Sequence, residues 1–114
     1  MTTITKGFYK KYDHDKNGPL GNKTFELMGI AHSTSKKGDR FFIFRPLDPS
    51  MYVYKEGMQW DAKLLEDWFL PAYNDGKNCE RYKLVTDEKE IAMLEELRDA
   101  LYANEPKELK ISNR

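Results

Sequence analysis

Residues 21–45 constrain the fold more than any other segment, because they have the pattern of a β-hairpin. Residues 24–30 and 41–44 form two runs rich in apolar and aromatic residues, as strands do. Between them, residues 33–40 form a polar loop that contains Gly38, which is typical of a turn. The sequence therefore predicts two hairpin strands here, although nothing in it dictates a reaction.

Two more strands and an aromatic run surround the hairpin. The first strand is predicted at residues 7–12, where Phe8 alternates with Lys10 and Tyr9 with Lys11, so the pattern leaves the buried face open. A closing strand is predicted at 81–85, after a turn at 74–77. The aromatic run is residues 51–54, and residues 13–21 form a loop dense in Asp, Asn, Gly and Pro.

Two helices are predicted in the second half of the chain. Within 61–70, Asp61 is placed to cap a short helix and Pro71 to end it, and the residues at helical spacing are Leu64, Leu65, Trp68 and Phe69. A longer helix begins at Asp87, and Glu90 follows three residues later, a pair typical of a helix start. Its apolar stripe predicts packing over the strands or against a second copy, and consists of Ile91, Leu94, Leu97, Ala100 and Leu101.

These elements predict an α+β fold, with about five strands in a small antiparallel β-barrel or a strongly bent sheet. One short helix and a C-terminal amphipathic helix at 87–103 complete it. With 114 residues the chain has the size of one domain, which we place at residues 1–103. Residues 104–114 form a polar tail that we expect to be frayed.

The composition favours a soluble, cytoplasmic protein. No apolar run approaches the roughly 20 residues of a membrane helix, and the first residues lack the apolar centre of a signal peptide. The lone Cys79 has no partner for an internal disulfide. This favours a reducing compartment and a surface thiol over an intermolecular bridge.

The charges cancel over the whole chain, with nineteen basic and nineteen acidic residues. Neutrality argues against strong sequence-independent binding of nucleic acid, which depends on neutralising phosphates. The charge is uneven, because residues 1–40 carry eight Lys or Arg and four Asp or Glu, a net +4 that the remaining residues balance. The basic and acidic parts either lie on opposite faces or neutralise each other in the fold.

Asp13, Asp15, Asn17 and Gly18 match the start of a calcium-binding loop, in which alternate oxygens face the ion. The twelfth position of such a loop requires a bidentate Glu, and here it is Thr24. We therefore expect an ordinary turn rich in Asp and Asn rather than a metal site, with Asp13, Asp15 and Asn17 as weak metal candidates.

The sequence carries no recognisable catalytic pattern. His14 and His32 are the only imidazoles, so a His-rich metal site is excluded, and a Cys–His dyad would require Cys79 to meet one of them. There is no Gly-rich phosphate loop and no nucleophile elbow. We therefore expect no enzymatic activity and no cofactor, and we expect His32 to anchor the hairpin loop by hydrogen bonds.

Several short motifs follow one another in a recognisable order along residues 7–85. They are Gly7-Phe8-Tyr9, the run GNKTFELMGIAHSTS from Gly21, FFIF from Phe41, Trp60 with Trp68-Phe69, Gly76, and Arg81-Tyr82. In this order the chain resembles a family of short bacterial domains of unknown function, most strongly at Gly29, Ala31, His32 and Ser33. The resemblance implies an SH3-like small β-barrel without established chemistry, and it supplies no catalytic residue.

The chain departs from that family's pattern in three places. Residues 13–20 look like an insertion, and Ser35 stands near an expected acidic residue. Asp61-Ala62-Lys63 replaces a stretch in which the family has Arg-Pro. If those polar residues form a site in the family, this chain has lost or changed it.

Two classes of function stay open. We favour a non-enzymatic protein-interaction domain with a regulatory or inhibitory role, because interfaces favour Tyr and Trp. Six of the fifteen aromatic residues lie in short or irregular segments, although they would serve equally as core: Tyr9, Tyr12, Tyr52, Tyr54, Trp60 and Tyr73. The alternative is binding of a small ligand, a nucleotide or single-stranded nucleic acid, by stacking and with phosphate contacts from Lys36, Lys37, Arg40 and Arg45.

The candidate binding residues lie around the hairpin loop and after it, since loops on a rigid sheet often carry binding residues. They are His32, Arg40, Arg45, Tyr52, Tyr54 and Trp60. We expect Arg40 and Arg45 to be surface charges, whose replacement by Ala weakens binding and leaves the thermal midpoint nearly unchanged. The next candidate is the acidic face of the last helix, with Glu88, Glu95, Glu96 and Asp99.

Overall fold

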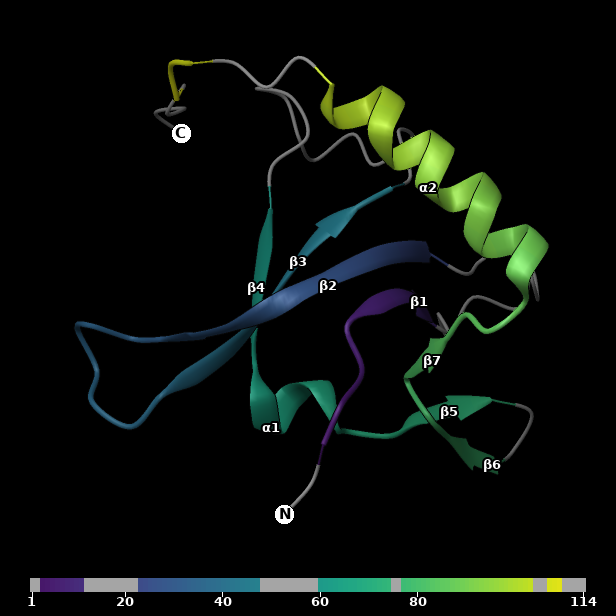
Figure 1. The fold of residues 1–114 in the computed structure, drawn as a ribbon. Coiled ribbons are helices and arrows are strands. Elements are labelled where there is room, and N and C mark those ends of the chain that lie inside the picture. Colours follow the sequence, from purple (N-terminus) through teal and green to yellow (C-terminus); the bar gives the residue numbers. More distant parts are fainter. Residues whose placement is uncertain (1–2, 12–22, 48–59, 75–76, 104–106, 110–114) are drawn as a thin grey trace.

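The computed structural model describes residues 3–11, 23–47, 60–74, 77–103 and 107–109 (Figure 1). It shows the predicted α+β fold. The elements in chain order are β1 (Gly7–Lys11), β2 (Lys23–His32), β3 (Arg40–Pro46), β4 (Asp61–Leu64), α1 (Leu65–Trp68), β5 (Ala72–Asn74), β6 (Lys77–Cys79), β7 (Tyr82–Leu84) and α2 (Glu88–Tyr102). Within the described ranges, no helix is long and apolar enough to cross a membrane.

Five of the strands form one antiparallel sheet in the order β4-β3-β2-β1-β7. Strands β5 and β6 pair separately. The large sheet is not closed into a barrel, because β4 and β7 form its two edges among the described residues. Of the two predicted alternatives, the barrel is therefore not observed, and among the described residues the five strands form an open sheet.

The predicted hairpin is confirmed as β2 and β3. Its register pairs Leu27 with Phe44 and Ile30 with Phe42, and a β-bulge lies between Leu27 and Gly29. The loop that joins the strands projects away from the rest of the molecule (Figure 1). Gly38 lies in this loop with φ 96°, a left-handed conformation that suits glycine.

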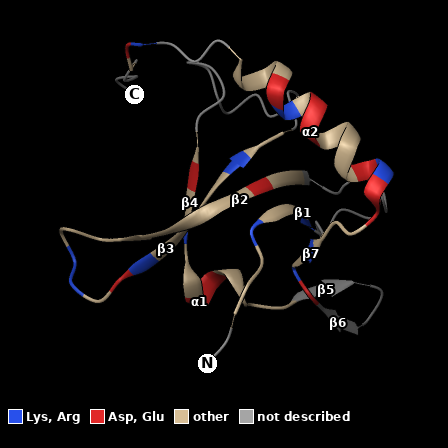
Figure 2. Ribbon diagram, viewed as in Figure 1, with Lys and Arg blue, Asp and Glu red and all other residues tan. Residues whose placement is uncertain are grey.

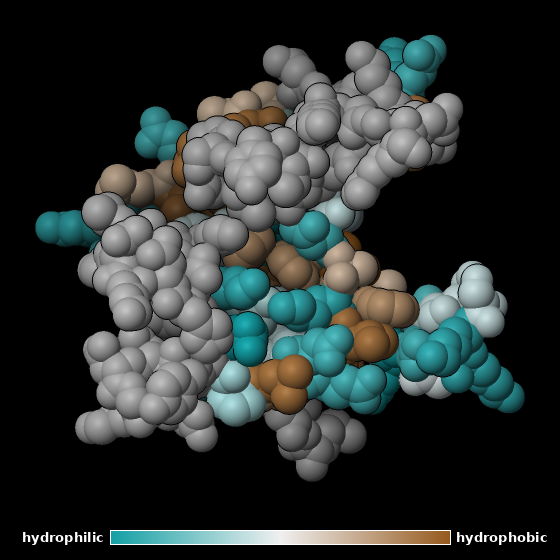
Figure 3. Space-filling model, turned by 180° about the vertical axis from the view of Figure 1, so that it is seen from behind, coloured by the Kyte–Doolittle hydropathy of each residue, from teal (hydrophilic) through white to brown (hydrophobic). Residues whose placement is uncertain are grey.

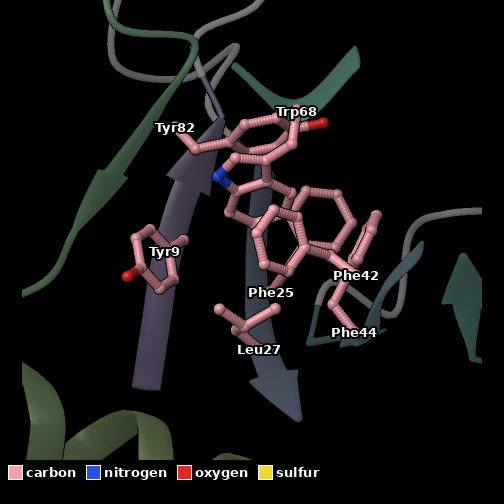
Figure 4. Close-up of a cluster of buried hydrophobic side chains, with 7 residues drawn as sticks. All are labelled: Tyr9, Phe25, Leu27, Phe42, Phe44, Trp68 and Tyr82. Atoms are coloured by element: carbon pink, nitrogen blue, oxygen red, sulfur yellow. The ribbon is translucent and has the colours of Figure 1, made fainter. Parts of the chain in front are cut away.

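One face of the sheet carries an aromatic core (Figure 4). Trp68 of α1 stacks on Tyr82 of β7, with 3.9 Å between the ring centroids and 11° between the planes. The buried residues of this cluster are Tyr9, Phe25, Leu27, Phe42, Phe44, Trp68 and Tyr82. Alternate residues of β2 and β3 supply it, as the alternation of side chains along a strand requires.

The opposite face carries a second core beneath α2, which lies across the sheet in Figure 1. Its buried residues are Phe8, Leu47 and Val85. The residues packed against them are Ile91, Leu94, Leu101 and Tyr102 of α2. Phe8 and Tyr9 are adjacent in β1 and buried on opposite faces, which explains why the sequence pattern did not identify one buried face.

Helix α2 starts as predicted, because the Asp87 side chain accepts a hydrogen bond from the Glu90 backbone N–H at 2.9 Å. Its predicted stripe is confirmed only in part, since Leu97 is 38% exposed and Ala100 is exposed. Arg98 lies on the side of α2 that faces the sheet, with its guanidinium 5.7 Å from the centroid of the Phe8 ring.

The segment 61–70 differs from the prediction. Asp61 does not cap a helix, because it begins β4 and pairs with Phe44 of β3. Helix α1 starts only at Leu65, with no side-chain hydrogen bond at its cap. The apolar residues of 61–70 have helical spacing, so the sequence pattern did not indicate a strand at its start. The pairing of β5 with β6 was also not predicted from the sequence.

Candidate functional site

The hairpin loop holds two of the predicted site residues. His32 and Arg40 pair across β2 and β3 at the base of the loop, and both are exposed. Ser33 anchors the loop: its backbone N–H donates to the Asp39 carbonyl at 2.9 Å, and its hydroxyl accepts from the Lys36 N–H at 2.9 Å. These bonds, rather than a bond from His32, close the loop within the described residues.

Arg45 lies at the other end of β3 and belongs to a different environment. Its Nε donates to Glu26 Oε1 at 2.7 Å, and Arg98 Nη1 donates to Glu26 Oε2, also at 2.7 Å. The Arg45 guanidinium lies 4.6 Å from the Tyr102 ring centroid and 5.8 Å from that of Trp60. The hydrogen bond to Glu26 raises the pKa of Arg98 above its usual value. This network ties β2, β3 and α2 together.

The structure therefore brings Trp60 and Arg45 together but separates them from His32 and Arg40. Arg45 is only 15% exposed, so the expectation that it is a surface charge is wrong. The other candidates lie outside the described residues, namely Tyr52, Tyr54, Asp13, Asp15 and Asn17. Among the described residues, no three His, Cys, Asp or Glu side chains gather as metal ligands would.

A groove of about 240 Å³ opens beside α1 and β7, on the face of the aromatic core. Its lining is contributed by the segment before β1, by β1, by α1 and the residue after it, and by the chain around β7. The lining residues are Ile4, Tyr9, Trp68, Phe69, Glu80, Arg81, Tyr82 and Leu84. None of them is one of the six candidate binding residues around the hairpin loop. Tyr9, which the sequence offered as either an interface or a core aromatic, lines the groove and is buried.

Apolar side chains at the groove are unusually accessible. Phe69 is 53% exposed and Leu84 is 38% exposed, and Leu70 beside Phe69 is 52% exposed. Phe69 packs edge-on against the buried Phe42, with 5.8 Å between the ring centroids, so it is held in place from beneath. Figure 3 shows, on the face seen from behind, further hydrophobic surface interleaved with hydrophilic residues.

Arg81 fixes the rim of the groove. Its Nε donates to the Leu70 carbonyl at 3.1 Å, and its Nη2 donates to the Pro71 carbonyl at 3.2 Å. The side chain thus ties the entry of β7 to the chain after α1, including the exposed Leu70. The groove is therefore preformed rather than bounded by a free loop.

Tyr82 and Lys63 form a polar pair behind the stacked rings. Lys63 Nζ donates to the Tyr82 hydroxyl at 2.7 Å and lies 5.2 Å from the centroid of that ring. Burial raises the pKa of Tyr82 to about 12. Burial and then the charge of Arg81 lower the pKa of Lys63. The pair satisfies the polar end of a ring that otherwise belongs to the core.

The chain was compared with protein-family models, with curated proteins and with solved structures. No protein-family model matches the chain, and neither a curated protein nor a solved structure does. The class that the fold defines is therefore a small α+β protein with an open antiparallel sheet and a helix across one face. The resemblance to short bacterial domains stays an expectation.

Proposed function

We propose that this chain is a non-enzymatic protein-interaction module that receives an apolar side chain of its partner in the groove beside α1 and β7. The observation that carries the proposal is the exposure of Phe69, Leu70 and Leu84 around this open groove. Apolar and aromatic residues around a shallow pocket are what the centres of protein interfaces contain. By binding, this chain would regulate or inhibit its protein partner.

The size of the groove favours a protein partner over an enclosed small molecule. At about 240 Å³ it lies below the roughly 300–1,000 Å³ of typical small-molecule sites, and it is open to solvent. A single large side chain of a partner fits such a volume, while the rest of the contact spreads over the surrounding surface. Glu80 and Arg81 at the rim supply polar groups of both signs.

The alternative, binding of nucleotides or single-stranded nucleic acid, has less support. It relied on Lys36, Lys37, Arg40 and Arg45 acting together on phosphate groups. Arg45 is instead engaged with Glu26 at the far end of β3. The overall charge of the chain is also zero.

The test is a photo-crosslinking experiment in extracts of the source cells. A benzoylphenylalanine at position 69 is expected to crosslink one protein, and the same group at position 109 is expected to crosslink none. Leu109 is the matched control because it is apolar, 89% exposed and absent from the groove lining.

Substitutions then test whether the groove provides the affinity. Leu84→Ser is expected to weaken capture of that protein at least tenfold, which corresponds to more than about 1.4 kcal/mol. Leu109→Ser is expected to leave capture unchanged, and thermal melting confirms that both variants fold. Equal capture by wild type and Leu84→Ser, or a small molecule that copurifies in place of a protein, would reject the proposal.

A further inference from the structure

Helix α2 carries a second set of aligned side chains that face away from the sheet. At 100° per residue, five exposed residues fall within about 100° of arc on this outer side. They are Lys89, Met93, Glu96, Leu97 and Ala100. Met93 is 69% exposed and Leu97 is 38% exposed, and they are neighbours at i and i+4. We call these five residues the outer stripe.

The charges on the outer stripe have a particular arrangement. Lys89 and Glu96 are seven residues apart, so they lie two turns apart on almost the same line along the helix. Neither has an ion-pair partner within 4 Å among the residues that the structure describes. The remaining exposed acids of α2 fall on the other flank of the helix by their spacing: Glu88, Glu95 and Asp99. Figure 2 shows acidic residues at several positions along α2.

Two antiparallel copies of α2 match each other at this stripe. If a two-fold axis passes beside Ala92 and Met93, Lys89 of each copy faces Glu96 of the other copy. The two Met93 side chains then pack at the axis, and Leu97 packs along the aliphatic stem of the opposite Lys89. Ala92 is small and lets the helices approach closely.

We propose that two copies of this chain associate through the outer stripe as an antiparallel helix pair with two reciprocal Lys89–Glu96 contacts. A second copy is the occupant because the pattern is complementary to itself. The chain has a net charge of zero, so two copies do not repel each other at long range. The association is weak and reversible, since one helix pair buries less than the roughly 1,200 Å² of a standard interface.

The proposed pairing is independent of the groove, because α2 covers the sheet face opposite to the aromatic core. Leu84→Ser is therefore expected to leave self-association unchanged. The outer-stripe variants are expected to leave capture by the groove unchanged in each protomer. Failure of one proposal does not imply failure of the other.

Sedimentation velocity of the full chain at low ionic strength tests the pairing. The wild type is expected to change from monomer to dimer as its concentration rises. Lys89→Glu and Glu96→Lys are each expected to weaken dimerisation at least tenfold, because each brings two pairs of like charges together. An equimolar mixture of these two variants is expected to dimerise again, since the introduced acid of one then faces the introduced base of the other.

Glu88→Lys is the matched control, because it makes the same change of charge as Glu96→Lys on the other flank of α2. It is expected to leave the dissociation constant of the dimer within about twofold of the wild-type value. Circular dichroism confirms that every variant folds. The proposal is overturned if the wild type stays monomeric at every concentration, if the mixture associates no better than its components, or if Glu88→Lys acts as strongly as Glu96→Lys.

Discussion

The two arginines of β3 show how much the surroundings of a residue decide its role. Arg40 is exposed at the base of the hairpin loop. Arg45 is 15% exposed and donates to Glu26, which is itself 13% exposed and also accepts from Arg98. Hydrogen bonds to charged groups that are shielded from water contribute more to stability than those of exposed pairs.

Arg45→Ala is therefore expected to lower the free energy of unfolding by about 1–3 kcal/mol. Arg40→Ala is expected to change it by no more than about 0.5 kcal/mol. Chemical denaturation of both variants measures the difference. Equal stabilities would show that the network at Glu26 contributes nothing to the fold.

Tyr82 makes the stability depend on pH in the alkaline range. The unfolded tyrosine loses its proton near pH 10, whereas in the folded protein its pKa is raised to about 12. Between these values the unfolded state binds fewer protons than the folded state, so the free energy of unfolding falls as pH rises. The stability provided by the neutral ring is fully present below pH 10.

Tyr82→Phe removes this titration. The difference in unfolding free energy between wild type and Tyr82→Phe is expected to stay constant from pH 7 to 9 and to shift against the wild type from pH 10 to 12. Lys63 is present in both proteins, so its titration enters the difference only through its contact with the Tyr82 hydroxyl. Chemical denaturation at four or five pH values measures this difference in unfolding free energy. If the difference is the same at pH 8 and pH 11, the pKa of Tyr82 is not raised in the folded protein.

At the scale of elements, local sequence signals were sufficient to predict the hairpin and α2. The cap at Asp87 is a single side chain that satisfies one backbone N–H of the first helical turn. The connection between β7 and α2 is short, so this cap also sets where the helix begins.

Asp87→Ala is expected to cost about 0.5–2 kcal/mol of stability. Asp87→Ser retains a side-chain acceptor and is expected to recover most of that loss. Thermal and chemical denaturation compare the three proteins. If Asp87→Ser is as unstable as Asp87→Ala, the hydrogen bond to Glu90 is not the cause of the effect.

At the scale of the whole molecule, the central sheet has a core on each face, and the strands are shared between them. Tyr9 and Phe8 of β1 enter the two cores from adjacent positions. If one core is lost, the strands on which the other core packs become exposed on one face. We expect the two cores to unfold together.

A chain that ends at Thr86 tests this expectation. It lacks α2, uncovers Phe8, Leu47 and Val85, and removes Arg98 from Glu26. We expect it to lose cooperative thermal unfolding and to bind the dye ANS, which reports exposed apolar surface. A sharp transition within a few degrees of that of the full chain would instead show that the aromatic core folds alone.

The sequence by itself determined the elements whose signals are local. Strand alternation, the turn chemistry of 33–40 and the Asp87 cap act within a few residues, so β2, β3, β7 and α2 were predicted close to their observed positions. Only the tertiary structure decided the rest. Strand β4 forms because the edge of β3 offers backbone partners to Asp61–Leu64, which outweighs the helical spacing there. The Glu26 network joins residues 72 positions apart, and the groove brings Ile4 near the start of the chain together with Leu84. No local pattern encodes such contacts.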